Sequence, residues 1–387
     1  MDETATTGTR DAAGERSSAP PTARQIAAQL SGRIVGQREA VAEVAIALAK
    51  RLSGVHAGNI LMIGSSGMGK TTLMRAVEHY FGERPALQSP AAVAAPAPGE
   101  RPIVLRLHAN VLGREAERGR PGQVVLLGLL EQARTVLGPE ATLEQLCERI
   151  SGGVVFVDEV DKIRSQVEGE PNVAGIRAQE SLLTLMENES VPVDLPEWLG
   201  SGRVDIDSRQ LLFVAGGAFE GLYDAVYDRV TVGADRGALQ PVTVVEGTSV
   251  REELPFRLRD WLRPEDLFAY GMSPQFLSRY ESVVLLDDLR PGDLVQILLE
   301  APDSPYLLAR DYFAAYGVDL ALSPSAAQRI AEAAARRKRI GARALREIFR
   351  QVVRPFEIDP PAAAEGGVLS IDLPEVERAM ARPGDTI

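Results

Sequence analysis

Between residues 59 and 81 an apolar run, a glycine-rich loop and a helical pattern follow one another directly. The run NILMI at residues 59–63 is typical of a buried parallel strand, and it leads into GSSGMGKT at residues 64–71. This loop fits the phosphate-binding pattern G-x-x-x-x-G-K-[ST], in which backbone N–H groups surround phosphate oxygens where a helix begins. A chance lysine at position 70 is a poor explanation, because the chain has only four lysines: Lys50, Lys70, Lys162 and Lys338.

The charged and hydroxyl residues that end this loop indicate which ligand it binds. In the pattern, the ammonium group of Lys70 reaches the β and γ phosphates of a nucleoside triphosphate. The hydroxyl of Thr71 is a ligand for Mg²⁺. The loop therefore predicts a site for ATP and Mg²⁺.

A second motif supplies acidic residues of the kind that such a site needs. The sequence GVVFVDE at residues 153–159 is a buried strand that ends in two carboxylates, and parallel sheets place ligands at the carboxyl ends of their strands. We expect Asp158 to hold the magnesium ion and Glu159 to polarise the attacking water. Acidic residues are common after a strand, so this motif alone is a moderate indication of a magnesium site. Together with the phosphate-binding loop it is a strong one.

The order of apolar runs and helical patterns predicts the fold class. Further buried strands are expected at residues 103–107, 154–157 and 211–214, and helical patterns separate them. Such alternation favours an α/β fold with a parallel sheet that is flanked by helices. Beyond Pro291 the pattern is helical up to a short closing strand at residues 367–372, which predicts a small, mainly helical C-terminal lid domain.

Composition along the chain suggests where these domains begin and end. Residues 1–24 contain almost nothing large and apolar and predict a disordered tail. We expect the nucleotide-binding domain at residues 25–285, with a Pro/Ala-rich inserted loop at residues 83–102, and the lid at residues 286–387.

Charge and composition disfavour several classes of function. The formal charge of −12 opposes sequence-independent binding to nucleic acid phosphates, and no apolar run is long enough to span a membrane. With one cysteine and three histidines, no cysteine-rich zinc module can form, and none of the histidines has the spacing of a ligand set. We expect a cytoplasmic protein with no membrane partner.

Five further stretches resemble the AAA+ ATPases, and most closely those of the ClpX and HslU family of unfoldases. They are IVGQ at 34–37, VDEVDKI at 157–163, LLFVAGGAF at 211–219, GMSPQFLSR at 271–279 and GAR at 341–343. They occur in the family's order, and the resemblance extends over roughly residues 31–375.

The resemblance implies roles for residues beyond the two motifs. Arg343 corresponds to the sensor arginine that reaches the nucleotide from the small domain, and Arg279 to the arginine finger that reaches a neighbouring subunit's γ-phosphate. A finger of this kind implies a ring, expected to be a hexamer. The residues then expected to bind the nucleotide are Ile34, Val35, Gly64, Ser65, Ser66, Gly67, Met68, Gly69, Lys70, Thr71, Thr72 and Arg343.

Other family features are missing from this sequence. The aromatic pore loop is replaced by GRPG at residues 119–122, and the tripeptide that docks the ClpP peptidase is absent around residues 231–239. The strand at residues 211–214 is followed by Ala215, Gly216 and Gly217, which offer no polar sensor side chain. Because the sequence has one cysteine, we also expect no zinc-binding amino-terminal domain of the family's kind.

These observations together predict an ATP-hydrolysing ring that unfolds or remodels a protein partner without ClpP. One alternative is a motor or loader that nucleic acid stimulates, with Arg120 facing phosphates in the channel. Another is a scaffold in which ATP hydrolysis times the assembly of partners and which does not thread a polypeptide. The basic run at residues 336–339 does not by itself favour nucleic acid, because such runs usually form a solvated face.

Overall fold

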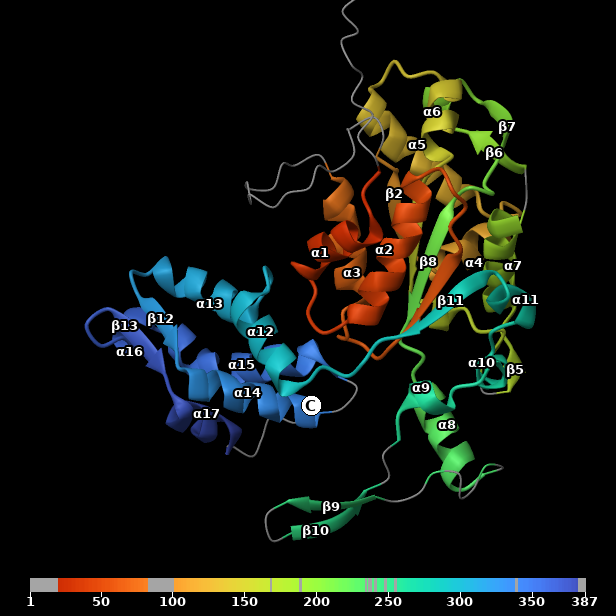
Figure 1. Cartoon of the computed structure of the whole chain (residues 1–387). Coiled ribbons are helices and arrows are strands. Elements are labelled where there is room, and N and C mark those ends of the chain that lie inside the picture. Colours follow the sequence, from red (N-terminus) through yellow and green to blue (C-terminus); the bar gives the residue numbers. More distant parts are fainter. Residues whose placement is uncertain are drawn as a thin grey trace, which may run out of the picture.

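The centre of the molecule is a five-stranded parallel sheet, seen in a computed structural model (Figure 1). The structure describes residues 20–82, 101–167, 169–187, 190–233, 235, 239, 242–246, 249–253, 256–337 and 340–381. Adjacent strands in the sheet are, in order, β11 (Tyr280–Leu285), β1 (Asn59–Ile63), β8 (Leu212–Gly217), β3 (Val154–Asp158) and β2 (Val104–His108). All four strand pairings are parallel.

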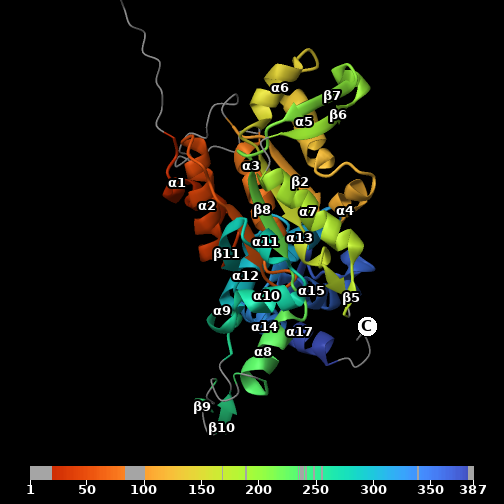
Figure 2. The same ribbon diagram turned by 90° about the vertical axis from the view of Figure 1, so that its right-hand side faces the viewer.

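Helices cover both faces of this sheet because its strands carry apolar side chains on both sides. In β1, Ile60 and Met62 belong to one buried cluster, whereas Leu61 and Ile63 belong to another. The first cluster includes residues of α1 (Ala23–Ser31), α2 (Arg38–Leu52) and α3 (Lys70–Phe81). The second includes residues of α4 (Asn110–Glu117), α5 (Gln123–Leu137), α6 (Leu143–Ile150) and α7 (Val173–Glu187). Both views show this division (Figures 1 and 2). The predicted α/β fold is therefore confirmed.

Short elements connect the strands of the sheet. They are η2 (Val160–Lys162), β4 (Gln166–Val167), β5 (Glu170–Pro171), β6 (Val191–Leu195), η3 (Glu197–Leu199), β7 (Gly202–Ile206), α8 (Leu222–Thr231), β9 (Val242–Glu246), β10 (Ser249–Glu253), α9 (Leu258–Trp261), α10 (Pro264–Tyr270) and α11 (Pro274–Leu277). The hairpin of β6 and β7 packs beside α5, and the hairpin of β9 and β10 projects from the body in both views (Figures 1 and 2).

The C-terminal part of the chain is mainly helical and lies beside the sheet (Figure 1). Its elements are α12 (Pro291–Glu300), α13 (Pro305–Ala314), β12 (Asp319–Leu322), α14 (Pro324–Arg336), α15 (Ala342–Glu357), α16 (Pro360–Ala363), β13 (Val368–Ile371) and α17 (Leu373–Met380). The side chains spaced along one face of α15 are buried, as their periodicity predicts: Leu345, Ile348, Phe349 and Val352. They belong to the same buried cluster as Ile60 and Met62 of β1, so the helical part and one face of the sheet share a core.

Some predicted features lie wholly or partly outside the described residues. Residues 1–19 of the expected tail and residues 83–100 of the expected insertion are not described, nor are parts of 231–239 and 336–339. The helix α1 begins at Ala23, where Thr22 forms a capping box with Gln25. Within the described residues, no helix is long and apolar enough to cross a membrane.

Candidate nucleotide-binding site

The loop of residues 64–69 lies at the carboxyl end of β1, and α3 begins directly after it at Lys70. The Lys70 side chain is buried, and its ammonium group donates to the carbonyl oxygens of Gly64 and Ser65, the latter at 3.0 Å. Burial lowers the pKa of Lys70 to about 8, although the carboxylates of Asp158 and Asp161 favour the charged form. A buried cation that has only neutral carbonyl partners in the loop suits an incoming triphosphate.

The two sequence motifs meet at this edge of the sheet. The hydroxyl of Thr71 donates to Oδ2 of Asp158 at 2.9 Å, because β1 and β3 both pair in parallel with β8 and end at the same edge of the sheet. Hydroxyl and carboxylate oxygens are the ligands that Mg²⁺ prefers, so this donor set fits a magnesium ion bound to nucleotide phosphates. Glu159 follows with a left-handed backbone, φ 59°, and its side chain is exposed. Its N–H donates to Oδ1 of Asp158 at 2.9 Å.

A histidine that the sequence did not single out lies beside the candidate base. Nδ1 of His108 is 3.7 Å from Oε2 of Glu159, a distance of ion-pair range that is too long for a hydrogen bond. The parallel register of β2 and β3 places His108 opposite Asp158. The sequence held a usable signal: His108 ends the strand next to the one that ends in Asp158, and parallel strands end at one edge.

Asp161 lies beside the end of β8, where the sequence has no polar sensor side chain. It is 1% exposed, its Oδ1 accepts from the N–H of Ala218 at 3.0 Å, and its Oδ2 lies 3.4 Å from Nζ of Lys162. A Cβ at Gly217 would lie 2.8 Å from Oδ1 of Asp161, so a larger residue there would displace the carboxylate. The missing side chain at the end of β8 is thus matched by a buried acid from the neighbouring loop.

The expected adenine-contacting residues lie next to the loop. Ile34 is buried, and its Cδ1 is 3.4 Å from where a Cβ of Gly69 would lie. Gln37, three residues later, exchanges two hydrogen bonds with the backbone of Asp287, in the connection between β11 and α12. A cavity of about 110 Å³ opens between Met68 and the helical part, with Leu294 and Ala334 among its lining residues. The remaining predicted residues, Val35, Ser65, Ser66 and Thr72, lie partly or fully exposed around the loop.

The first turn of α15 touches the phosphate-binding loop. The N–H of Ala342 donates to the carbonyl of Gly67 at 3.2 Å, which brings Arg343 to the rim of the site. The charge of Arg343 also lowers the pKa of Lys70, although burial is the main cause. Arg343 is exposed and thus accessible to a ligand.

Arg279 is the one predicted residue that the structure keeps away from this site. It directly precedes β11, at the amino ends of the strands, whereas the loop of residues 64–69 follows the carboxyl end of β1. Its guanidinium forms an ion pair with Glu187, the last residue of α7. Within one chain, Arg279 is therefore too far from Lys70 to act on a nucleotide at the loop of residues 64–69.

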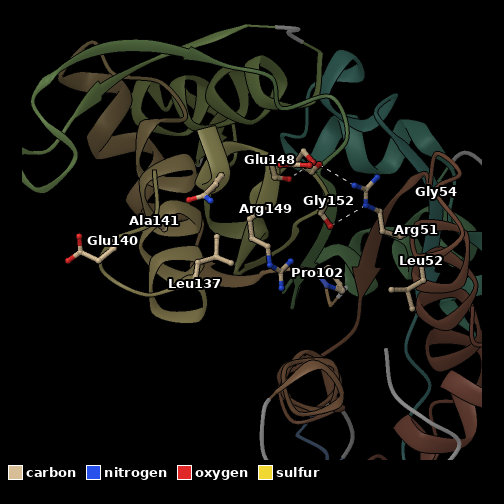
Figure 3. A pocket seen from close by; sticks show the side chains of 12 residues that line it. Arg51, Leu52, Gly54, Pro102, Leu137, Glu140, Ala141, Glu148, Arg149 and Gly152 are labelled. Carbon is tan, nitrogen blue, oxygen red and sulfur yellow. Dashed lines mark hydrogen bonds between the residues drawn. The ribbon is translucent and has the colours of Figure 1, made fainter. Parts of the chain in front are cut away.

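A cavity of about 740 Å³ lies elsewhere, beside the amino end of β3 (Figure 3). Arg51 extends into the gap and donates to the carbonyl oxygens of Ser151 and Gly152 at 3.2 and 3.1 Å. Glu148 and Arg149 also line this cavity. It contains none of the predicted site residues, and its own charged groups are of both signs, so we do not assign nucleotide binding to it.

Comparison with known proteins agrees with this geometry. The model of the ATPase family associated with various cellular activities (AAA) matches residues 60–233. The chain is 30% identical to the ATP-dependent Clp protease ATP-binding subunit ClpX 3 of Methylococcus capsulatus, over 84% of this chain and 68% of that protein. It is 28% identical to ClpX of Azotobacter vinelandii, over 82% and 66%, and 26% identical to ClpX of Treponema denticola, over 95% and 84%.

Proposed function

This chain belongs to the AAA family of ATPases as a divergent relative of ClpX, and we propose that it is an ATP-driven ring that unfolds or remodels a protein partner. It hydrolyses ATP. The partner, the assembly and the roles of single residues are parts of the proposal. The observation that carries it is the contact of Thr71 with Asp158 beside the buried Lys70.

In this proposal each site residue has its own role in binding or hydrolysing ATP. Backbone N–H groups of the loop and the ammonium of Lys70 hold the phosphates, and Thr71 and Asp158 hold Mg²⁺, which neutralises charge on the β and γ phosphates. Glu159 accepts the proton of the attacking water; its exposed carboxylate is free to turn toward the γ-phosphate. Nδ1 of His108 lies 3.7 Å from Oε2 of Glu159, so we assign His108 a supporting role beside the base.

The position of Arg279 supports a ring. Because its guanidinium lies at the end of the sheet opposite the loop, we assign it to the nucleotide of a neighbouring subunit, where a fixed planar cation stabilises transition-state charge. We propose a hexamer of identical chains, by analogy with ClpX. The absence of the docking tripeptide from the sequence supports activity without ClpP.

The stretch that replaces the family's pore loop is held by its own subunit. Residues 118–122 form a turn between α4 and α5, in which the N–H of Gly122 donates to the buried hydroxyl of Ser181 at 2.8 Å. Nε of Arg120 is 3.5 Å from Oδ2 of Asp194. A tethered turn without an aromatic side chain is a poor grip for continuous threading. This favours limited remodelling, and it supports the scaffold alternative as the second candidate function.

The pairing of Arg120 with Asp194 also bears on the nucleic-acid alternative. An Arg120 side chain that a carboxylate neutralises offers less attraction to phosphates than an unpaired one. Together with the formal charge of −12, this keeps the nucleic-acid motor the less favoured proposal.

A substrate trap tests the proposed function. Glu159→Gln keeps the side chain's size and removes the base, so the variant should bind ATP, hydrolyse it about 10² to 10⁴ times more slowly, and retain its partner. Affinity capture with this variant in ATP, compared with Lys70→Ala as the matched variant that cannot bind ATP, should enrich one protein.

The captured protein is then used to separate the candidates. ATP-dependent loss of its folded signal in the presence of the parent ring supports remodelling, whereas ATP-dependent binding without any change in the partner supports the scaffold. Stimulation of ATP hydrolysis by single-stranded DNA or RNA, with no stimulation by the protein, would contradict both and favour the nucleic-acid motor.

A further inference from the structure

Gln179 is a buried amide in the middle of α7 that the nucleotide chemistry above does not use. Its side chain is 2% exposed and makes three hydrogen bonds. Nε2 donates to the carbonyl oxygens of Ile163 and Gly271 at 2.8 and 3.0 Å, and Oε1 accepts from the N–H of Ser273 at 2.9 Å. All three partners are backbone groups from outside the helix, so the side chain ties separate segments together.

These segments belong to the two halves of the proposed reaction site. Ile163 comes four residues after Glu159, at the end of the loop that carries Asp161. Gly271 and Ser273 begin the segment that ends at Arg279, and Ser273 caps the short helix α11 within it. Gln179 is therefore a direct bridge from the acidic motif of one site to the segment that presents the finger.

Other hydrogen bonds fix the start of the finger segment at the same point. The carbonyl of Gly271 also accepts from the N–H and the hydroxyl of Ser165, at 2.7 and 2.9 Å. Ser165 lies two residues after Ile163 in the loop that follows β3. The start of the segment is thus tied to the end of this loop by three donors, and one of them is Gln179.

The far end of the finger segment is held as well. Nδ2 of Asn59 donates to the carbonyl of Arg279 at 3.0 Å, while Oδ1 of Asn59 accepts from the N–H of Phe213 at 2.9 Å. Glu187, which pairs with the guanidinium of Arg279, lies on α7 two turns beyond Gln179. One helix thus contacts both the start and the tip of the finger segment.

We propose that Gln179 is a positioning residue for Arg279, which transmits the state of the acidic loop of one subunit to the finger that it offers its neighbour. This inference rests on the proposed role of Arg279 in a ring. This position needs a neutral amide. Two carbonyl oxygens need hydrogen-bond donors and one N–H needs an acceptor, and the amide group of glutamine provides both kinds of atom. Glutamate has no donor for the carbonyls, and leucine has neither group.

Substitution of Gln179 should affect turnover more than nucleotide binding. In Gln179→Leu we expect kcat for ATP to fall about 10- to 100-fold, as for a reacting group that is displaced by about 1 Å, with KM changed less than about threefold. Gln179→Glu keeps the acceptor for Ser273 and provides a second variant if the leucine variant fails to fold.

Gln123→Leu is the matched control for loss of a buried glutamine. Gln123 is 5% exposed and donates to the carbonyl of Asp194, away from the finger segment. A purely structural effect of losing a buried amide should lower the melting temperature of both variants, whereas the fall in kcat should be confined to Gln179→Leu.

Two combinations test the link to Arg279. If Gln179 acts through the finger, Gln179→Leu should add less than about twofold to the defect of Arg279→Ala, because the finger is already gone. Rings mixed from Gln179→Leu and Glu159→Gln subunits should also recover activity above either variant alone, since one supplies an intact cis site and the other an intact finger.

The outcomes separate this inference from the function on which it rests. If Arg279→Ala hydrolyses ATP like the parent, the finger itself is wrong and the positioning role fails with it. Two results would overturn only the positioning role, provided that Arg279→Ala is defective. One is a variant with both Gln179→Leu and Arg279→Ala whose defect equals the product of the two single defects. The other is a lack of activity in mixed rings that have demonstrably co-assembled.

Discussion

The N–H of Ala342 lies 3.2 Å from the carbonyl oxygen of Gly67 and donates a hydrogen bond to it, so the first turn of α15 is joined to the phosphate-binding loop. Neither Gly67 nor Gly341 has room for a side chain at this contact. A Cβ at Gly67 would lie 2.5 Å from the carbonyl oxygen of Ile340, and one at Gly341 would lie 2.7 Å from that of Gly67. Two glycines thus let the helical part rest directly on the loop, where it can respond to bound phosphates.

Replacing Gly67 should disrupt the contact between the phosphate-binding loop and the first turn of α15. Gly67 has φ +82°, a left-handed value that costs other residues about 1–2 kcal/mol, and Gly67→Ala adds a clash with backbone that has little room to move. We expect ATP affinity to fall at least about tenfold. Nucleotide titration checks this, with Gly54→Ala as a control, since Gly54 has φ +72° but open space around its Cβ position. Equal losses of affinity in the two variants would contradict a specific contact.

The charge of Lys70 should be needed for nucleotide binding itself. Lys70→Ala removes the one ammonium that the loop encloses, and the remaining donors around the phosphates are mostly neutral N–H groups. We expect ATP binding to become undetectable at concentrations that saturate the parent. Calorimetric titration measures it, and unchanged binding by a folded variant would contradict the assignment of the loop.

Four of the five strands of the sheet could be predicted from the sequence, because each has a local apolar pattern. The edge strand β11 was not predicted, since its side chains are only partly buried and it has no continuous apolar run. The two motifs that the structure brings together through Thr71 and Asp158 are local patterns as well. The run at residues 59–63, the loop after it and the acids that end the run at 154–157 each have a signature of spacing and polarity. The observed limits of two strands differ slightly from the predicted ones. The strand predicted at residues 103–107 spans Val104–His108, and the one predicted at residues 211–214 spans Leu212–Gly217.

Contacts between distant segments could not be predicted in the same way. The bonds of Gln179 to Gly271 and of Gln37 to Asp287 join residues 92 and 250 positions apart, and a glutamine has no pattern that names its partner. The spacing of the three histidines predicts no role for His108, yet strand register brings it to Glu159. The pairing of Arg120 with Asp194 likewise depends on how the β6–β7 hairpin folds back.

His108 should tune the candidate base without replacing it. In His108→Ala the Glu159 carboxylate loses the one basic side chain that lies within 4 Å of it among the described residues. We expect kcat for ATP to change by about 2- to 10-fold while ATP affinity stays within twofold. Steady-state kinetics with His108→Ala and Glu159→Gln side by side checks the ranking. A defect in His108→Ala as large as that of Glu159→Gln would make His108 itself the base.

His79 should make stability depend on pH. Nη2 of Arg33 donates to Nε2 of His79 at 2.6 Å, and burial together with the Arg33 charge lowers the pKa of His79 below 6.5. Between that lowered pKa and 6.5 the unfolded chain binds more protons than the folded one, so stability increases with pH there and is lost as pH falls. Melting temperatures from pH 5 to 7.5 should therefore rise less steeply in His79→Gln than in the parent. Identical slopes would contradict this.

The charge pair of Arg120 and Asp194 should decide how the ring responds to acidic partners. The two side chains are about half exposed, so removing one leaves its partner free to act on a ligand. If this turn faces the channel, six copies form a ring of paired charges. Arg120→Ala then leaves six carboxylates that repel acidic polypeptide, and Asp194→Asn leaves six cations that attract it.

We therefore expect Arg120→Ala to lower the stimulation of ATP hydrolysis by polyglutamate several-fold, and Asp194→Asn to raise it with a steeper dependence on salt, since exposed charges are screened within about 10 Å at 0.1 M. ATPase assays over 50 to 300 mM salt, roughly the range in which such screening changes, measure both effects. Polylysine is the control, because its response to the two variants should be reversed. If both variants respond to both polymers like the parent, Arg120 is a surface turn residue and the substrate enters by another face.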